Sequence, residues 1–196
     1  MARSLPIKFI VVIFSILLVS CSAIVNTQQP TQKQRQLFVT YKDFNKPDSA
    51  CDHAEKWSRL DVMNGYYCQL KYSYEPRPND SDYLYISELI VLCGDKTLAE
   101  ASFRGMDKAA TAAEKKDTIL TYELSKDLKK IGDTSVLEFI HHKDSPAGVQ
   151  FRCLNNKAAI YLQIMGRRCD SAADWEAFIL PKITKLNDYI AAAAHK

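Results

Sequence analysis

Glycine is scarce in this chain, with six residues among 196. A loop that cradles a phosphate or a dinucleotide needs closely spaced glycines, so such a loop is hard to place anywhere in the sequence. The motifs of serine hydrolases, β-lactamases and zinc proteases are also missing, since no Gly-x-Ser-x-Gly, Ser-x-x-Lys or His-Glu-x-x-His segment occurs. The sequence therefore predicts no cofactor, no catalytic residue and a protein that is not an enzyme.

A large charge of one sign is missing as well. The formal charge of the whole chain is +3, and setting aside Arg3 and Lys8 near the N-terminus leaves +1. A dedicated nucleic-acid-binding protein carries a strong excess of basic residues. We therefore expect no nucleic-acid partner, and we interpret the short basic runs, which have acidic residues close by, as solvated surface.

The first 21 residues carry the clearest signal that is present. Arg3 and Lys8 form a short basic start, an apolar run extends from Phe9 to Leu18, and a small residue precedes Cys21. This order predicts a secretion signal. The closing segment Leu18-Val19-Ser20-Cys21 resembles the lipobox of bacterial lipoproteins, and the resemblance implies that Cys21 is lipidated and becomes the new N-terminus.

Two other interpretations of this segment stay open. Cleavage after Ala23 would make it an ordinary secretory signal. Alternatively, Phe9 to Val25 could remain as an uncleaved anchor helix, although this stretch is at the short limit for spanning a bilayer. All three interpretations place the globular part outside the cytoplasm, at the cell membrane or the outer membrane, facing the periplasm or the exterior.

The sequence divides into a signal peptide at residues 1–20, a flexible polar tether at residues 21–36 and one extracytoplasmic domain at residues 37–196. Within the domain, a short strand is expected at 38–41. Asp48 or Ser49 is then expected to start a helix that carries Ala54, Trp57 and Leu60 on one face. Alternation predicts strands at 66–74 and 83–93, and a second helix starts near Thr97. Next we expect a turn or two of helix at 124–131 and strands at 136–142, 149–154 and 158–165. A final helix, capped by Ser171 and Asp174, ends the domain.

This order, α-β-β-α-β-β-β-α, predicts an α+β fold in which an antiparallel sheet of about five strands packs against helices. Pro181 predicts a kink or restart in the last helix. The segment Leu128-Lys129-Lys130-Ile131-Gly132-Asp133, the strand Ala158 to Met165 and the long helix after it resemble the C-terminal half of some extracytoplasmic lipoprotein and sensor domains. These include the extracellular domain of the kinase PknH and the PsbP/Mog1-like sandwich, and the resemblance implies a binding or scaffolding role without catalysis.

Five cysteines follow Cys21, and an odd number leaves one thiol over when two disulfides form. Export makes disulfides plausible. The preferred pairs are Cys51 with Cys68 and Cys153 with Cys169, although the sequence alone does not choose among the pairings. Cys93 is then left as a buried, inert thiol.

Six of the ten tyrosines fall between residues 66 and 85, namely Tyr66, Tyr67, Tyr72, Tyr74, Tyr83 and Tyr85. Alternation places Tyr66, Tyr72 and Tyr74 on the core face of a strand. Tyr67, Tyr83 and Tyr85 remain as candidates for contact with a partner, because tyrosine combines apolar area with a hydrogen-bonding tip.

Other chemistry is less favoured. His141 and His142 are adjacent in a strand and point to opposite faces, so they do not readily share a metal. Cys51-Asp52-His53 lacks the second close pair of a structural zinc site, and His195 lies at the end of the last helix. Asp80, Asp82 and Glu88 could supply an acid/base pair, but acids near a loop normally aid solubility.

We therefore expect a membrane-tethered extracytoplasmic lipoprotein that acts as a non-catalytic binding or accessory protein, such as a small subunit of a membrane or envelope complex. Its partners would be the membrane, through the N-terminal lipid or an uncleaved helix, and a protein of the envelope. A small-ligand carrier or sensor is the alternative, and an exported hydrolase is a further one.

Overall fold

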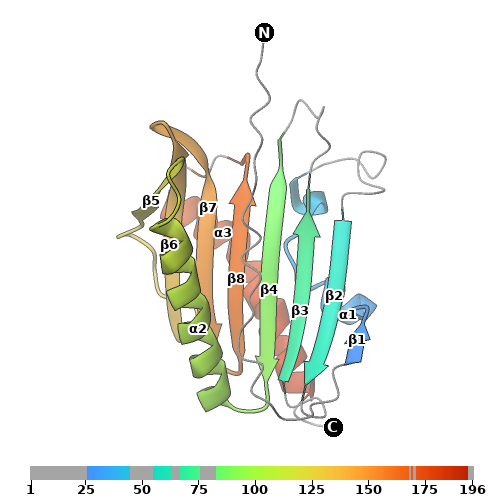
Figure 1. Cartoon of the computed structure of the whole chain (residues 1–196). Coiled ribbons are helices and arrows are strands. Elements are labelled where there is room, and N and C mark those ends of the chain that lie inside the picture. Colours follow the sequence, from blue (N-terminus) through green and yellow to red (C-terminus); the bar gives the residue numbers. More distant parts are fainter. Residues whose placement is uncertain are drawn as a thin grey trace.

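The computed structural model describes residues 26–44, 55–62, 67–75, 83–167, 169 and 171–193. Within these ranges the strands form one antiparallel sheet of eight, in the order β1-β2-β3-β4-β8-β7-β6-β5 (Figure 1). The strands are β1 (Asn26–Gln28), β2 (Glu55–Val62), β3 (Tyr67–Tyr74), β4 (Tyr85–Cys93), β5 (Leu120–Leu124), β6 (Thr134–His142), β7 (Ser145–Asn155) and β8 (Ala158–Met165). The helices are α1 (Gln32–Arg35), the 3-10 turn η1 (Tyr41–Phe44), α2 (Lys96–Glu114) and α3 (Ala172–Ala193).

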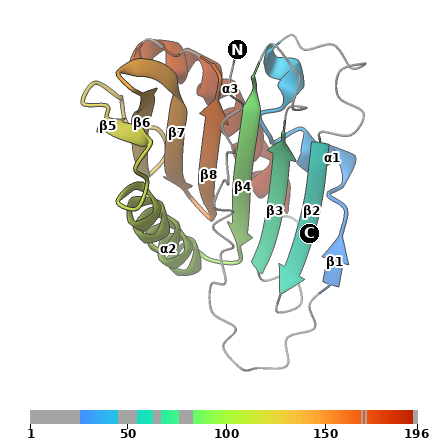
Figure 2. The same ribbon diagram turned by 45° about the horizontal axis from the view of Figure 1, so that its top comes forward.

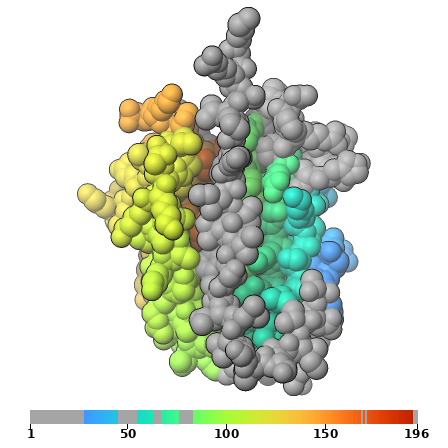
Figure 3. Space-filling model, in the orientation of Figure 1, coloured from blue at the N-terminus to red at the C-terminus, as the bar shows by residue number. Residues whose placement is uncertain are grey.

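Helices lie on both faces of the sheet. Helix α3 crosses behind the sheet in Figures 1 and 2, and α2 lies in front of it. In Figure 3, α2 forms the surface on one side of the front face, and atoms of β2 and β3 form it on the other side. The larger apolar core lies on the α3 face, where the N-terminal segment 37–41 also packs, and the smaller one lies under α2.

Alternation along β3 follows the prediction. Cys68, Leu70, Tyr72 and Tyr74 are buried on the α3 face, while the residues between them are half-buried or exposed. Because successive strand residues point to opposite faces, one period-two pattern is enough to identify both the strand and its core side.

The last helix also begins as predicted. The Ser171 hydroxyl accepts a hydrogen bond from the backbone N–H of Asp174 at 3.1 Å and donates to the Asp174 carboxylate at 2.8 Å. These bonds satisfy part of the unpaired N-terminal turn. Of the kink or restart expected at Pro181, the restart is wrong, because α3 runs through Pro181 as one helix, with Ile179 and Ile183 buried on either side of it, and the kink stays a prediction.

The expected helix that carries Trp57 and Leu60 is wrong. Residues 55–62 form strand β2, which pairs with β3 along its whole length, with Trp57 opposite Tyr72. The helical spacing of Ala54, Trp57 and Leu60 extends over only three residues. Packing against the neighbouring strand outweighs so short a pattern. The rings of Trp57 and Tyr72 lie 4.4 Å apart between centroids.

Two other elements also differ from expectation. Residues 120–124 form the edge strand β5 against β6, and no helix forms at 124–131. In place of a strand at 38–41, the chain runs irregularly to Thr40 and turns into η1. Strands β1, β2 and β5 make the sheet wider than the expected five strands. The element order therefore differs from the predicted one.

Folded structure begins earlier in the chain than expected. Residues 26–36 were assigned to the tether, yet Asn26–Gln28 pair with β2 and Gln32–Arg35 form α1. Gln34 is buried although it belongs to this polar stretch. The described fold therefore starts at Asn26 and not at Leu37.

Candidate functional site

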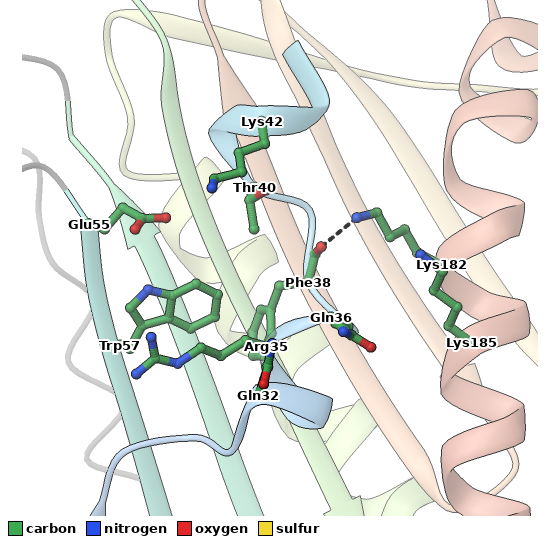
Figure 4. A pocket seen from close by; sticks show the side chains of 10 residues that line it. All are labelled: Gln32, Arg35, Gln36, Phe38, Thr40, Lys42, Glu55, Trp57, Lys182 and Lys185. Atoms are coloured by element: carbon green, nitrogen blue, oxygen red, sulfur yellow. Dashed lines mark hydrogen bonds between the residues drawn. The ribbon is translucent and has the colours of Figure 1, made fainter. Parts of the chain in front are cut away.

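A groove of about 380 Å³ opens between α1, the segment 36–42, β2 and α3 (Figure 4). Its floor is Phe38, which is fully buried, and Trp57 on β2 forms one wall. The lining residues are Gln32, Arg35, Gln36, Phe38, Thr40, Lys42, Glu55, Trp57, Lys182 and Lys185. The groove thus brings together three parts of the chain that are far apart in the sequence, namely residues 32–42, β2 and α3.

Helix α1 is short, and side-chain bonds hold it in place. The Thr31 hydroxyl accepts from the Gln34 N–H at 3.3 Å, and the Gln34 side-chain oxygen accepts from the Thr31 N–H at 2.9 Å, which is a capping box. The Gln34 amide donates to the Tyr189 hydroxyl of α3 at 3.0 Å, and Arg59 of β2 donates to Gln34 at 3.3 Å. Gln34 therefore fastens α1 to both walls of the groove.

Arg35 and Trp57 form the aromatic wall. The guanidinium carbon of Arg35 lies 5.2 Å from the centroid of the Trp57 ring, within cation–π distance. Trp57 in turn packs edge-on against Phe38, with centroids 5.3 Å apart. The Arg35 Nε donates to the Pro30 carbonyl at 3.2 Å. The wall is thus a cation over the Trp57 ring, which meets the Phe38 ring of the floor edge-on.

The floor is held from α3 by one lysine. Lys182 Nζ donates to the Phe38 carbonyl at 2.7 Å and lies 3.0 Å from the Asp43 carboxylate (Figure 4 shows the first contact). Asp43 also accepts from the Thr40 N–H at 2.7 Å. Segment 38–43 is therefore fixed to α3 through charge-assisted hydrogen bonds.

Glu88 holds the same segment from the sheet side. Its carboxylate accepts from the Val39 N–H at 2.7 Å, and its side chain is buried. Burial raises the pKa of Glu88 to about 8, against the lowering effects of the Val39 hydrogen bond and the Lys182 charge. Glu88 was considered as one member of an acid/base pair, but Asp80 and Asp82 lie outside the described residues, and Glu88 lies in the interior.

The lining of the groove is cationic. Arg35, Lys42, Lys182 and Lys185 face a single carboxylate, Glu55. Lys182 is paired with Asp43, so Arg35, Lys42 and Lys185 remain against Glu55 and leave the lining with an excess of positive charge. Such an arrangement attracts anions, and the indole and phenyl rings add apolar contact area.

Tyr67 lies apart from the other two candidate tyrosines, Tyr83 and Tyr85. Tyr67 lies opposite Cys93, and Tyr85 lies eight residues away along β4, a separation of roughly 26 Å at 3.3 Å per residue. Tyr67 is half-buried, and its hydroxyl accepts from the Gln69 amide at 2.7 Å. Tyr83 is partly exposed and Tyr85 is half-buried. The structure thus separates Tyr67 from Tyr83 and Tyr85.

The cysteines that the structure describes, Cys68, Cys93, Cys153 and Cys169, are thiols. Cys153 is buried and donates to the Ile131 carbonyl at 3.4 Å, and Cys169 donates to the Ser171 carbonyl at 3.5 Å, so they are not joined. Cys51 and Cys21 lie outside the described residues, and the pairing of Cys51 with Cys68 stays a prediction for the oxidised protein. Burial raises the pKa of Cys68 and of Cys153 to about 12 and also raises the pKa of Cys93. Thiols of this kind are poor nucleophiles.

The histidines do not gather into a metal site. His141 lies 3.4 Å from the Glu123 carboxylate, and His142 is half-buried at the end of β6. Among the described residues, no group of three or more histidine, cysteine or acidic side chains could hold a metal ion. Cys51, Asp52, His53 and His195 lie outside those residues.

One polar cluster was missed by the sequence analysis. Arg152 of β7 is buried under α2 and contacts Asp107 at 3.0 Å, Glu114 at 2.9 Å and Glu138 at 2.9 Å. Gln150 donates to Glu114 at 2.6 Å and to Glu138 at 3.0 Å. Burial, and then the charge of Glu138, raise the pKa of Glu114. The cluster joins α2 to the sheet, and the only trace of it in the sequence is polar Gln150 and Arg152 in an otherwise apolar strand.

Comparison with protein-family models, with curated proteins and with solved structures gives no match. None of the described helices is long and apolar enough to cross a membrane.

Proposed function

We propose that this chain is a membrane-tethered extracytoplasmic lipoprotein whose domain is a non-catalytic binding or accessory module. The observation that carries the binding role is the cationic groove with its stacked Arg35 and Trp57. The order of basic start, apolar run and Leu18-Val19-Ser20-Cys21 supports the tether. On this proposal the domain serves as a small subunit of a membrane or envelope complex, anchored at the cell membrane or the outer membrane.

The chemistry of the groove favours binding over catalysis. Its titratable lining consists of four cations and one carboxylate, and these do not form a pair of nucleophile and base. Glu88, whose pKa is raised to about 8, lies beneath the floor and is bonded to the Val39 backbone. The described thiols that sit in the core are held mostly protonated by burial.

The tether is tested by the intact mass of the protein extracted from its own membranes, beside a Cys21→Ala variant. A mass that starts at Cys21 with added acyl groups, lost in the variant, is the expected result. Several acyl chains give stable attachment, where one would be marginal. A chain that begins at residue 1 or 2 and stays membrane-bound would contradict lipidation and favour the anchor helix.

The accessory role is tested by affinity purification from native membranes. A stoichiometric protein partner is expected, and its recovery should fall in a Lys42→Glu, Lys185→Glu double variant. The matched control is Lys115→Glu, Lys116→Glu, which changes two exposed lysines just beyond α2. Recovery of no stoichiometric protein would contradict the accessory role.

A carrier or sensor for a small ligand is the second candidate. A concave site of about 380 Å³ between the sheet and helices is of the size that small ligands occupy. Native mass spectrometry of the purified full chain distinguishes this role, because a carrier should retain a small anionic compound in one-to-one ratio. The Lys42→Glu, Lys185→Glu variant should lose that compound.

A further inference from the structure

The length of chain between the lipid anchor and the fold restricts which surface can meet the membrane. If Cys21 is the lipidated residue, as the proposed function holds, five residue steps separate it from Asn26, the first residue of β1. A polypeptide spans at most roughly 3.6 Å per residue, so Asn26 lies within roughly 18 Å of Cys21 whatever the path of the chain. The expected sixteen-residue tether would have imposed no such limit.

The groove lies on the same edge of the sheet as Asn26. Asn26 pairs with Asp61 of β2, and Trp57 is four residues from Asp61 along that strand, or roughly 13 Å. Helix α1, which carries Arg35, follows β1 directly and forms the outer rim in Figures 1 and 2. The opposite edge, β5, is seven strand spacings away, or roughly 34 Å at 4.8 Å per spacing. A short tether therefore keeps the groove, and not the β5 edge, close to the anchored surface.

The charge of this edge suits an anionic surface. Lys185 and Arg35 are exposed, and Lys42 is exposed on η1. Lys182 is committed to Phe38 and Asp43 and forms the inner end of the groove. Lysine and arginine near an anionic bilayer are attracted to it within about a Debye length of 8–10 Å.

We infer that the edge formed by β1, α1 and β2 rests on the bilayer and that the cationic groove binds the phosphate groups of anionic lipids. The inference rests on the proposed lipid anchor and assigns the ligand class of the same groove. Arg35, Lys42 and Lys185 contact the phosphates, and Trp57 lies beside the interface, where amphipathic rings are favoured. The α2 and β5 side of the domain is left facing away from the membrane.

Hydrogen exchange on the acylated full chain tests this orientation. The protein is reconstituted in vesicles of phosphatidylcholine alone and in an equal mixture of phosphatidylcholine and phosphatidylglycerol. Backbone amides of residues 32–44 are expected to exchange roughly tenfold more slowly on the mixed vesicles at low salt, and to lose this protection at high salt. Amides of α2 and β5 are expected to exchange alike on both vesicles.

Two variants and the mass of the same sample separate the possible outcomes. Lys42→Glu, Lys185→Glu is expected to abolish the lipid-dependent protection, whereas Lys115→Glu, Lys116→Glu keeps it, and circular dichroism confirms that both are folded. Equal protection on both vesicles, or protection on the α2 side, would overturn the assignment. Protection that arises only in native membranes would assign the groove to an acidic protein partner. An intact mass without acyl groups would instead overturn the proposed anchor, independently of the exchange result.

Discussion

Glu88 is a carboxyl group enclosed between β4 and the segment 37–40. Its carboxylate accepts a hydrogen bond from the Val39 N–H, and the charge of Lys182 acts on it from the groove side. Burial raises the pKa of Glu88 to about 8, so near neutral pH the folded protein retains a proton that the unfolded chain releases.

The pH dependence of stability follows from this direction. For an acid whose pKa is raised in the folded state, the contribution to the free energy of unfolding is complete below the pKa of the unfolded chain, about 4.5. This contribution is lost as the pH rises toward 8. Glu88→Gln keeps an oxygen acceptor for Val39 and removes the titration. The variant is expected to gain up to roughly 4 kcal/mol over the native chain at pH 8 and little at pH 5.

Denaturant unfolding between pH 5 and 8 measures this effect. Glu100→Gln, which changes a carboxylate on the surface of α2, is the matched control and should follow the native pH profile. A Glu88→Gln profile parallel to that of the native chain would show that Glu88 does not hold the proton.

Arg152 is the positive centre of a buried acidic cluster. Removing it leaves Asp107, Glu114 and Glu138 close together and uncompensated. Arg152→Met is expected to lower the free energy of unfolding at pH 7 by roughly 3–5 kcal/mol, because breaking a buried pair leaves charges without a partner. The deficit should shrink as the pH falls, because burial and the charge of Glu138 raise the pKa of Glu114, which then takes up a proton.

A second substitution separates charge from packing in this cluster. Glu138→Gln in the Arg152→Met background should recover part of the lost stability, as measured by denaturant unfolding. Arg104→Met, which removes an exposed arginine 3.9 Å from Glu100, should change stability by less than about 0.5 kcal/mol. A loss in Arg152→Met that does not depend on pH would point to packing alone.

Helix α1 has four residues and depends on its cap. Such a short helix is unstable by itself, so the Thr31 and Gln34 bonds and the contact with Tyr189 hold it. Thr31→Ala is expected to cost about 1 kcal/mol locally. Hydrogen exchange should accelerate in residues 32–37 without an equal change in α3.

The control for the cap is Thr184→Ala. Thr184 is exposed on α3 and donates only to the Leu180 carbonyl of its own helix. It should leave exchange in α1 unchanged. If Thr31→Ala also leaves exchange in α1 unchanged, the cap does not stabilise this wall of the groove.

The end of β8 depends on a glycine. Gly166 has a φ of +79°, and a Cβ at this position would lie 1.5 Å from the Tyr83 carbonyl oxygen. Its N–H donates to the Ala147 carbonyl at 2.8 Å, so the backbone cannot easily move away. Gly166→Ala is expected to destabilise the protein by roughly 3 kcal/mol or more.

Thermal unfolding compares this variant with Gly105→Ala. Gly105 lies in the interior of α2, where alanine is favoured over glycine by up to about 1 kcal/mol. The two substitutions should therefore move the melting temperature in opposite directions. A small effect of Gly166→Ala would mean that the β8 end can rearrange around the added methyl group.

At the scale of the whole molecule, the sheet edge formed by β1, α1 and β2 lies close to the proposed lipid anchor at Cys21. Inserting about ten glycine and serine residues after Ala23 should let the domain move away from the bilayer, because effective concentration falls as a tether lengthens. Exchange protection of residues 32–44 on phosphatidylglycerol vesicles should then decrease. The same insertion between Lys143 and Asp144, in the turn between β6 and β7, should not change it.

Patterns that depend on near neighbours were predictable from the sequence. The alternation in β3 and the Ser171–Asp174 cap identified their elements, because side-chain direction in a strand and hydrogen bonding in a first turn are local. The α+β class and the antiparallel sheet followed from the short connections between strands. The prediction for residues 55–62 was wrong because pairing of β2 with β3 overrides a weak helical spacing.

The sequence by itself determined the near-neutral charge, the scarcity of glycine, the N-terminal signal pattern and the elements with a strong period. Only the tertiary structure decided that Arg35, Trp57 and Lys185 share a groove, that Arg152 is surrounded by three carboxylates, and that residues 26–28 pair with β2. The reason is physical. A local pattern reports which face of an element is apolar, whereas a groove or a buried charge cluster is made of residues whose proximity depends on how strands pair and helices pack.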